Sequence, residues 1–295
     1  MSARTSLERV TVATFGEMKR SGDPIVMVTA YDAPSARVAE AAGADAVLVG
    51  DSLGMTVLGY ASTLPVTLDD MLRHTAAVAR TVVRPLVVAD MPFGSYQASP
   101  DDAVANAVRL LAEAGAAAVK VEGGRSIAPL VERMVAAGIP VMGHLGLTPQ
   151  SVNVFGGYRV RAKETGEAIA LVEDALALEA AGAFAVVLEL VPAEVAAIVT
   201  EELEIPTIGI GAGPSCDGQV QVFHDLVGLS TFTPKHAKRY ADAERVLADA
   251  LAAYVREVRE GTFPGEANAT HASETVVAEL ETALPRTAAH APDEE

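Results

Sequence analysis

The chain has 295 residues, and its 39 acidic residues outnumber its 22 lysines and arginines, which leaves a formal net charge of −17. Nucleic-acid binding needs a basic surface, so this balance argues against it. No apolar run reaches the roughly 18 residues of a membrane helix, residues Met1 to Thr11 contain no hydrophobic signal segment, and the single Cys216 excludes an intrachain disulfide. These features predict a cytoplasmic protein. The acidity favours a surface adapted to high salt, and an ordinary acidic protein is the alternative.

Short apolar runs alternate with amphipathic stretches along the chain, as in α/β proteins with a parallel sheet. In chain order, the apolar runs predict strands at Ile25–Ala30, Ala46–Gly50, Leu86–Asp90, Ala117–Glu122, Val141–Leu145, Ala185–Leu190 and Thr207–Gly211, with an eighth near Asp225–Leu229. The amphipathic stretches predict helices at Ala33–Ala42, Leu68–Val83, Asp101–Ala114, Ile127–Ala137, Glu164–Ala181 and Ala193–Leu203.

The order and spacing of these elements predict one closed (β/α)8 barrel of the TIM type rather than an open sheet. The pattern is helical again from Ala241 to Glu260. After Gly265 the composition changes to Ala, Thr, Glu and Pro with little periodicity. We therefore expect residues 1–265 to be a single barrel domain, which would contain any catalytic site. Residues 266–295 are expected to be an acidic, flexible tail with a short helix at Glu274–Leu284.

Four carboxylates follow four of the predicted strands: Asp51, Asp90, Glu122 and Glu189 each stand where a hydrophobic run ends. Barrel enzymes have their active sites at the carboxyl ends of the strands, so we expect these acids to gather at one mouth. A single acid could merely cap a strand, but four in equivalent positions favour function. Crowded carboxylates repel one another unless a hard cation lies among them, so Asp51, Asp90 and Glu122 predict a magnesium site. Glu189, two strands further on, is predicted to be a general base.

Three other polar residues are predicted at the same mouth. Lys120 precedes Glu122 by two residues, so both side chains face one side of their strand. It could hold a substrate carboxylate or only form a salt bridge with Glu122. Ser52 could donate a hydrogen bond from the loop. His144, at the end of the fifth strand, could bind substrate or cofactor or be a satisfied, partly buried residue.

Several stretches around these residues carry a family resemblance. They are Val28–Asp32, Leu48–Val57, Ser62–Thr67, Ala89–Phe93, Lys120–Gly124, Gly143–Asn153, Phe155–Tyr158, Ile208–Gly213 and Asp217–Gln219. In these stretches the sequence resembles the ketopantoate hydroxymethyltransferase (3-methyl-2-oxobutanoate hydroxymethyltransferase) family. The resemblance extends from about Thr5 to Gly265.

The resemblance implies a barrel of the phosphoenolpyruvate mutase/isocitrate lyase-like group, a Mg2+ cofactor and a homo-oligomer, usually a decamer in bacteria. It implies transfer of a hydroxymethyl group from 5,10-methylenetetrahydrofolate, as co-substrate, to 3-methyl-2-oxobutanoate. The product would be ketopantoate (2-dehydropantoate), formed through a magnesium-stabilised enolate in pantothenate and coenzyme A biosynthesis. A methanopterin-type carrier remains an alternative to the folate.

By position, the resemblance makes Asp51, Asp90 and Glu122 the metal ligands and Glu189 the proton acceptor. The residues that would hold the 2-oxo acid are Asp51, Ser52, Asp90 and Lys120, to which we add His144.

Two rival functions fit less well. A lyase or mutase of the same superfamily would share the barrel and the enolate, but such lyases usually have a catalytic cysteine in a Lys-Lys-Cys-Gly-type loop. Cys216 lies in a different sequence context, with no flanking basic residue, and we treat it as an inert thiol. A non-catalytic barrel would be expected to lose one or more of the four acids, and all four are present.

Overall fold

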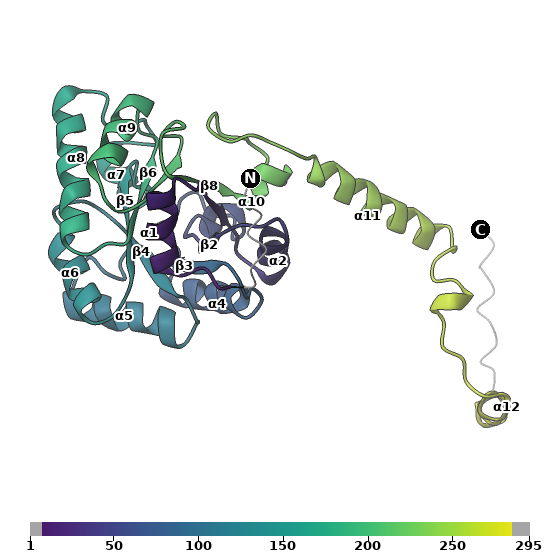
Figure 1. Cartoon of the computed structure of the whole chain (residues 1–295). Coiled ribbons are helices and arrows are strands. Elements are labelled where there is room, and N and C mark those ends of the chain that lie inside the picture. Colours follow the sequence, from purple (N-terminus) through teal and green to yellow (C-terminus); the bar gives the residue numbers. More distant parts are fainter. Residues whose placement is uncertain (1–7, 285–295) are drawn as a thin grey trace. The chain divides into compact units, whose positions relative to one another are not determined.

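The computed structural model describes residues 8–284, and its main feature is a closed barrel of eight parallel strands (Figure 1). Each strand pairs with the next in chain order, and the last pairs with the first. The strands are β1 (Ile25–Thr29), β2 (Ala46–Val49), β3 (Leu86–Asp90), β4 (Ala118–Glu122), β5 (Val141–Gly146), β6 (Ala185–Glu189), β7 (Thr207–Ile210) and β8 (Gly218–Val222). The predicted barrel is confirmed, and its first seven strands end within one residue of their predicted limits.

Residues alternate along each strand between the inside of the barrel and the surrounding helices. The inward-facing set forms one buried apolar cluster, which includes Met27, Leu48, Val88, Met142 and Val187. The outward-facing set belongs to a larger cluster between the strands and the helices. Both faces are apolar, which explains why most strands are continuous hydrophobic runs in the sequence.

Helix α1 (Val12–Ser21) packs against the end of the barrel at which the strands begin. Its buried Phe15 and Met18 belong to the interior cluster, and the Phe15 ring meets the Phe184 ring edge-on with 5.8 Å between centroids. The sequence prediction did not include this helix, because Phe15 and Met18 are the only buried residues among its ten. Such a sparse apolar pattern is a weak helix signal.

Six larger helices surround the strands (Figure 1). They are α2 (Ala33–Ala41), α4 (Leu68–Ala79), α5 (Pro100–Ala112), α6 (Ala128–Ala136), α8 (Thr165–Ala180) and α9 (Ala193–Glu202). All six confirm predicted helices. The predicted helices extend too far where the apolar pattern continues into a turn. Val82, for example, packs on the core after α4 has ended. Shorter helices lie in loops that follow strands: α3 (Leu53–Thr56), η1 (Pro149–Ser151), α7 (Val152–Phe155) and α10 (Phe223–Val227).

The position predicted for the eighth strand was wrong. We expected it near Asp225–Leu229, but β8 is Gly218–Val222, and α10 occupies most of the predicted segment. In β8 only Val220 belongs to the interior cluster, while Gln219 is exposed and Gln221 half-buried. The strand therefore has no continuous apolar run that could reveal it.

Residues 243–295 form a unit separate from residues 1–242. Its described elements are α11 (Ala243–Arg259), η2 (Glu266–Asn268) and α12 (Glu274–Ala283), and both α-helices confirm predicted ones. No residue of α11 is buried, and the domain boundary at residue 265 stays a prediction. Flexibility of residues 266–295 stays a prediction, and residues 285–295 lie outside the described part. Within residues 8–284, no helix is both long and apolar enough to cross a membrane.

Candidate active site

The inward-facing rows of the barrel change from apolar to charged near the ends of the strands. Four strands carry a polar residue two positions after their interior apolar residue, so it faces the inside of the barrel as well. These residues are Asp90 on β3, Lys120 on β4, His144 on β5 and Glu189 on β6. These side chains line a cavity of about 520 Å³ at the mouth of the barrel. All seven residues predicted for the site line it: Asp51, Ser52, Asp90, Lys120, Glu122, His144 and Glu189.

Asp51, Asp90 and Lys120 form the first group of contacts. The Asp51 backbone N–H donates to Asp90 Oδ2 over 3.0 Å. Lys120 Nζ lies 3.0 Å from Asp90 Oδ1, and the two side chains form a buried ion pair. Burial opposes the charge on Lys120, but the carboxylates of Asp90, Glu122 and Asp51 outweigh it and raise the pKa of the ammonium group. Lys120 is therefore charged at neutral pH.

His144 lies between two acids from the neighbouring strands. Its Nδ1 is 3.2 Å from Glu122 Oε1 and its Nε2 is 3.1 Å from Glu189 Oε2. Burial and the charge of Lys120, whose Nζ is 3.2 Å from Nδ1, both disfavour protonation. The contacts with Glu122 and Glu189 prevail and raise the pKa of His144 to about 9. The two carboxylates thus favour the protonated form of His144, and the Lys120 ammonium group opposes it.

Ser52 is oriented by a tyrosine from the preceding βα loop. The Tyr31 hydroxyl and Ser52 Oγ are 2.8 Å apart, and the Tyr31 side chain is buried. Burial raises the pKa of the Tyr31 phenol, so it keeps its proton and can donate it to Ser52. Tyr31 was quoted in a family-like stretch, but the sequence did not single it out.

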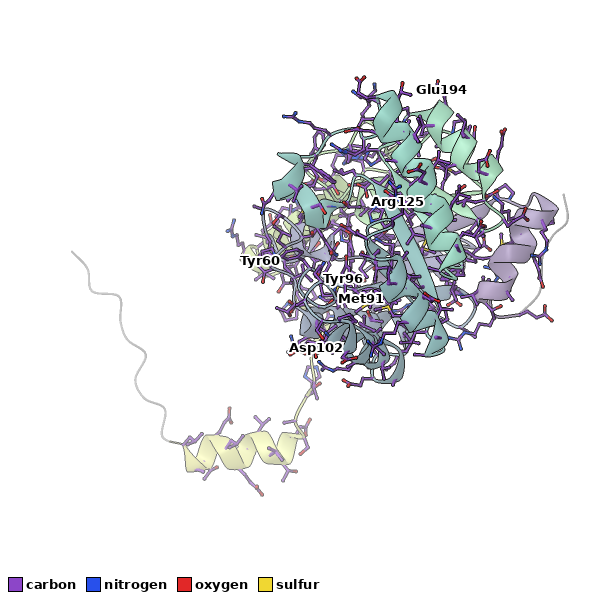
Figure 2. All side chains as sticks on the ribbon, turned by 90° about the vertical axis from the view of Figure 1, so that its left-hand side faces the viewer. Tyr60, Met91, Tyr96, Asp102, Arg125 and Glu194 are labelled. Carbon is purple, nitrogen blue, oxygen red and sulfur yellow. The ribbon has the colours of Figure 1, made fainter. Side chains whose placement is uncertain are left out.

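Gln150 and Tyr96 are two buried residues that the sequence reasoning missed. Gln150 Nε2 donates to Asp51 Oδ2 over 2.9 Å, and the Gln150 backbone N–H donates to Glu122 Oε2 over 3.0 Å. The Tyr96 hydroxyl donates to Gln150 Oε1 over 2.7 Å. Figure 2 shows Tyr96 and Met91 close together inside the barrel unit, where both contact Gln150. Gln150 belongs to a family-like stretch, whereas Tyr96 has no signal in this single sequence.

The floor of the cavity holds more buried acids than bases. Burial, followed by repulsion from Asp90 and Glu122, raises the pKa of Asp51 well above its usual range. Among residues 8–284, no three His, Cys, Asp or Glu side chains are already arranged as metal ligands. One reason is that both oxygens of Glu122 face protein donors, His144 and the Gln150 N–H. The metal site thus stays a prediction, supported by negative charge that the nearby bases do not balance.

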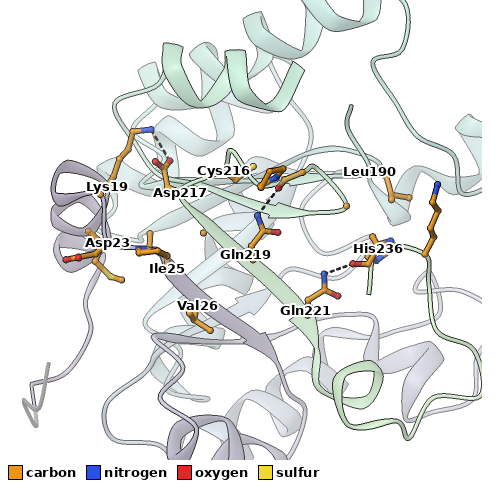
Figure 3. Close-up of a pocket in the computed structure, with 18 of the residues that line it drawn as sticks. Lys19, Asp23, Ile25, Val26, Leu190, Cys216, Asp217, Gln219, Gln221 and His236 are labelled. Atoms are coloured by element: carbon orange, nitrogen blue, oxygen red, sulfur yellow. Dashed lines mark hydrogen bonds and ion pairs between the residues drawn. The ribbon is translucent and has the colours of Figure 1, made fainter. Parts of the chain in front are cut away.

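A second, larger hollow of about 1060 Å³ lies along the outer face of β1 and β8 (Figure 3). Several of its polar side chains have partners within the fold: Lys19 pairs with Asp217 at 3.0 Å, and Gln219 Nε2 donates to the Gly213 carbonyl over 3.0 Å. Burial raises the pKa of Cys216, so the thiol keeps its proton, as expected for an inert residue. The concentration of buried charge therefore favours the mouth of the barrel as the active site.

A parallel eight-stranded barrel with buried acids, a lysine and a histidine at the carboxyl ends of its strands has the architecture of a barrel enzyme. A family model described as ketopantoate hydroxymethyltransferase matches residues 9–266. The chain belongs to this family, and it is a hydroxymethyltransferase.

Two relatives agree with this assignment, and a solved structure shares the fold. The 3-methyl-2-oxobutanoate hydroxymethyltransferase of Carboxydothermus hydrogenoformans is 59% identical over 261 residues, which cover 88% of this chain and 95% of that protein. The protein of the same name from Chloroflexus aurantiacus is 57% identical over 277 residues, 94% of this chain and 97% of its own. A 2,3-dimethylmalate lyase of the PEP mutase/isocitrate lyase superfamily shares the fold, with a TM-score of 0.55 and 20% identity over 91% of this chain and 93% of the lyase.

Proposed function

We propose that the chain transfers a hydroxymethyl group from 5,10-methylenetetrahydrofolate to 3-methyl-2-oxobutanoate and so forms ketopantoate (2-dehydropantoate). The substrate is the one in the names of the relatives. The observation that carries the proposal is one cavity lined by the Glu189 carboxylate, the Lys120 ammonium group and a cluster of acids. The reaction needs a base for the C3 proton and positive charge near the keto acid, and this cavity supplies both.

Glu189 is best placed to be the base. Its side chain is 18% exposed, whereas that of Glu122 is 5% exposed, so Glu189 faces the open part of the cavity. The contact with His144 Nε2 holds one oxygen of Glu189 and can leave the other to accept the C3 proton.

Lys120 and Ser52 would hold the 2-oxo acid. Lys120 is the only lysine in the cavity lining among the described residues, and its ammonium group can pair with the substrate carboxylate. The same charge stabilises the enolate that forms when the C3 proton leaves. Ser52, oriented by Tyr31, can donate its hydroxyl hydrogen to a substrate oxygen. Asp51, Asp90 and His144 would complete the substrate pocket.

Asp51, Asp90 and Glu122 would hold magnesium. Carboxylate oxygens are the ligands that Mg2+ prefers, and all three acids line the same cavity. The raised pKa of Asp51 also indicates that the site would gain from a nearby cation. When bound, the metal would supply Lewis acidity that makes the C3 hydrogen of the 2-oxo acid easier to remove.

The one-carbon carrier would approach from the rim of the cavity. Met55 and Tyr158 come from different loops and meet there, with 3.7 Å between the Met55 sulfur and the Tyr158 hydroxyl, and Phe232 lies in the same lining. These partly exposed apolar groups suit a planar heterocycle. C3 would form its new bond to the methylene carbon of the carrier, and water would then replace the carrier nitrogen, which leaves the hydroxymethyl group on C3.

We place this activity in pantothenate and coenzyme A biosynthesis, in the cytoplasm, and in a homo-oligomer, with a decamer as the first expectation. The pathway and the assembly rest on the family alone, and the location rests on the composition and the single cysteine. Size measurement by light scattering would test the assembly separately from the chemistry.

Proton NMR of 3-methyl-2-oxobutanoate in D2O with Mg2+ tests the proposal directly. We expect the protein to exchange the C3 proton without the carrier, and to form ketopantoate when 5,10-methylenetetrahydrofolate is added. Glu189→Gln should still bind Mg2+ and the 2-oxo acid but lose about 100-fold or more of the exchange rate. Glu194→Gln is the matched control, because Glu194 is an exposed acid on α9 that does not line the cavity.

Each outcome has a separate meaning. Near-normal exchange by Glu189→Gln would refute the base assignment. Exchange by the natural sequence without product would refute the folate as donor and favour another carrier. A folded protein that shows no exchange at all would refute the proposed reaction.

A further inference from the structure

Gln150 contacts two of the predicted metal ligands through different parts of one residue. Its side-chain Nε2 donates to Asp51 Oδ2 over 2.9 Å, and its backbone N–H donates to Glu122 Oε2 over 3.0 Å. The residue lies in η1, in the loop after β5, and it is buried. It is thus a direct link between a carboxylate that follows β2 and one at the end of β4.

No pairing in the sheet provides this link. In the barrel, β3 lies between β2 and β4, so the backbone ladder does not join the two strands that carry Asp51 and Glu122. Asp90, on β3, accepts from the Asp51 backbone and pairs with Lys120, so its contacts do not join Asp51 to Glu122. The spacing of the Asp51 and Glu122 carboxylates therefore depends on what holds their oxygens.

The orientation of the Gln150 amide is fixed by its other partners. Nε2 also donates to the Met91 carbonyl over 2.9 Å, and a carbonyl can only accept. Oε1 accepts from the Tyr96 hydroxyl over 2.7 Å and from Gln97 Nε2 over 3.1 Å. A flipped amide would place its oxygen against the Met91 carbonyl and the Asp51 carboxylate, which are both acceptors. The N–H group must therefore face Asp51.

Tyr96 connects this amide to the second acid. The Tyr96 hydroxyl accepts from the Glu122 backbone N–H over 3.1 Å and donates to Gln150 Oε1 over 2.7 Å, while the Glu122 carbonyl is a more distant acceptor at 3.4 Å. Tyr96 and Gln150 are both buried, and all four amide hydrogen-bonding positions of Gln150 are used. A buried network that is fully satisfied holds its members in one arrangement.

We propose that Gln150 is a positioning residue that sets the separation and direction of the Asp51 and Glu122 carboxylates for a divalent cation and the 2-oxo acid. The inference rests on the proposed function, since it assigns these two acids to metal and substrate. Gln150 acts through the acids and does not itself need to touch the substrate.

The test compares Gln150→Met with Gln219→Met. Methionine approximates the length of glutamine but cannot donate to Asp51, and the Gln150 backbone bond to Glu122 is retained. The Gln219 variant is the matched control, because it makes the same exchange on the outer face of β8, where Gln219 Nε2 donates to the Gly213 carbonyl and contacts no member of the Gln150 network. Magnesium affinity is measured by calorimetry without substrate, and the KM and kcat of C3 proton exchange are measured at saturating Mg2+.

For Gln150→Met we expect the Mg2+ dissociation constant and the KM for the 2-oxo acid to rise about 10- to 100-fold, the loss typical of a hydrogen bond to a charged group. The kcat of exchange should change much less, because Glu189 is held by His144 rather than by Gln150. Gln219→Met should match the natural protein in all three quantities. A fall in kcat with unchanged magnesium affinity and KM would overturn the positioning role.

Two further outcomes are informative. If Gln150→Met does not fold, Tyr96→Phe is the deciding variant, because it keeps Gln150 but removes the hydroxyl that fixes the amide. Unchanged magnesium affinity in a folded Tyr96→Phe would overturn the proposal. Absence of exchange in the natural protein would refute the proposed reaction, whereas the calorimetric comparison would still decide the role of Gln150.

Discussion

Gly146 allows β5 to approach β6 at the residue that carries the proposed base. Its φ is +89°, and a Cβ atom there would lie 2.2 Å from the backbone oxygen of Glu189. The next residue, Leu147, donates its N–H to that same oxygen over 2.8 Å. A side chain at position 146 therefore has to push the end of β6 away, because a backbone atom has no rotamer to move into.

For Gly146→Ala we predict a loss of about 2–5 kcal/mol in the free energy of unfolding. A non-glycine residue in the left-handed region costs about 1–2 kcal/mol, and overpacking of a buried site adds about 1–3 kcal/mol. Gly43→Ala is the matched control, because Gly43 has a φ of +91° but no atom within 4 Å of the added Cβ. It should cost only the first contribution, about 1–2 kcal/mol.

Urea unfolding of both variants measures the two costs, and C3 proton exchange measures the effect on Glu189. We expect exchange to fall at least about 10-fold in Gly146→Ala, because a displacement of the base by a fraction of an ångström weakens proton transfer. Gly43→Ala should exchange at the natural rate. Equal stability losses and equal exchange rates in the two variants would refute the close approach of Gly146 to Glu189.

The other predictions concern the charges in the cavity. The pKa of His144 is raised from 6.5 to about 9 on folding. Protonated His144 therefore adds about 3 kcal/mol to the free energy of unfolding. This stabilisation is complete below pH 6.5 and is lost as the pH rises through 9. Urea unfolding in the presence of a chelator should show that the free energy of unfolding declines between pH 6 and 10, and His144→Gln should largely lack this decline. If the two proteins gave parallel curves of stability against pH, the raised pKa of His144 would be contradicted. Lys120→Met leaves the buried Asp90 without its ion pair, so we expect a loss of about 3–5 kcal/mol together with tighter Mg2+ binding. A stable variant or weaker Mg2+ binding would contradict this balance of charge.

The barrel and its acids were predictable because both depend on local patterns. The strands are buried on two faces, so they are continuous apolar runs, and each of the four acids stands at the end of such a run. β8 was misplaced because it alternates Gln219 and Gln221 with buried residues and so resembles a polar segment. Helix α1 was missed because it uses only two buried side chains to close the barrel.

The contacts within the site depend on residues far apart in the sequence. Gln150 meets Asp51 across 99 positions and Tyr96 across 54 positions, so no spacing within a motif could predict the network. The charge of His144 likewise depends on Glu122 and Glu189 from two other strands. The sequence could name His144 as a candidate, but its protonation follows only from the assembled barrel.

The two-residue repeat of the strands couples the fold to the chemistry. In β3, Val88 packs inside the barrel and Asp90 reaches the cavity, and in β6 Val187 and Glu189 do the same. A shift of either strand by one residue would turn the acid outward under the helices and would also remove the valine from the core. The apolar interior therefore fixes the strand register that aligns the acids. The same inward-facing side chains thus determine both the stability of the barrel interior and the geometry of the active site.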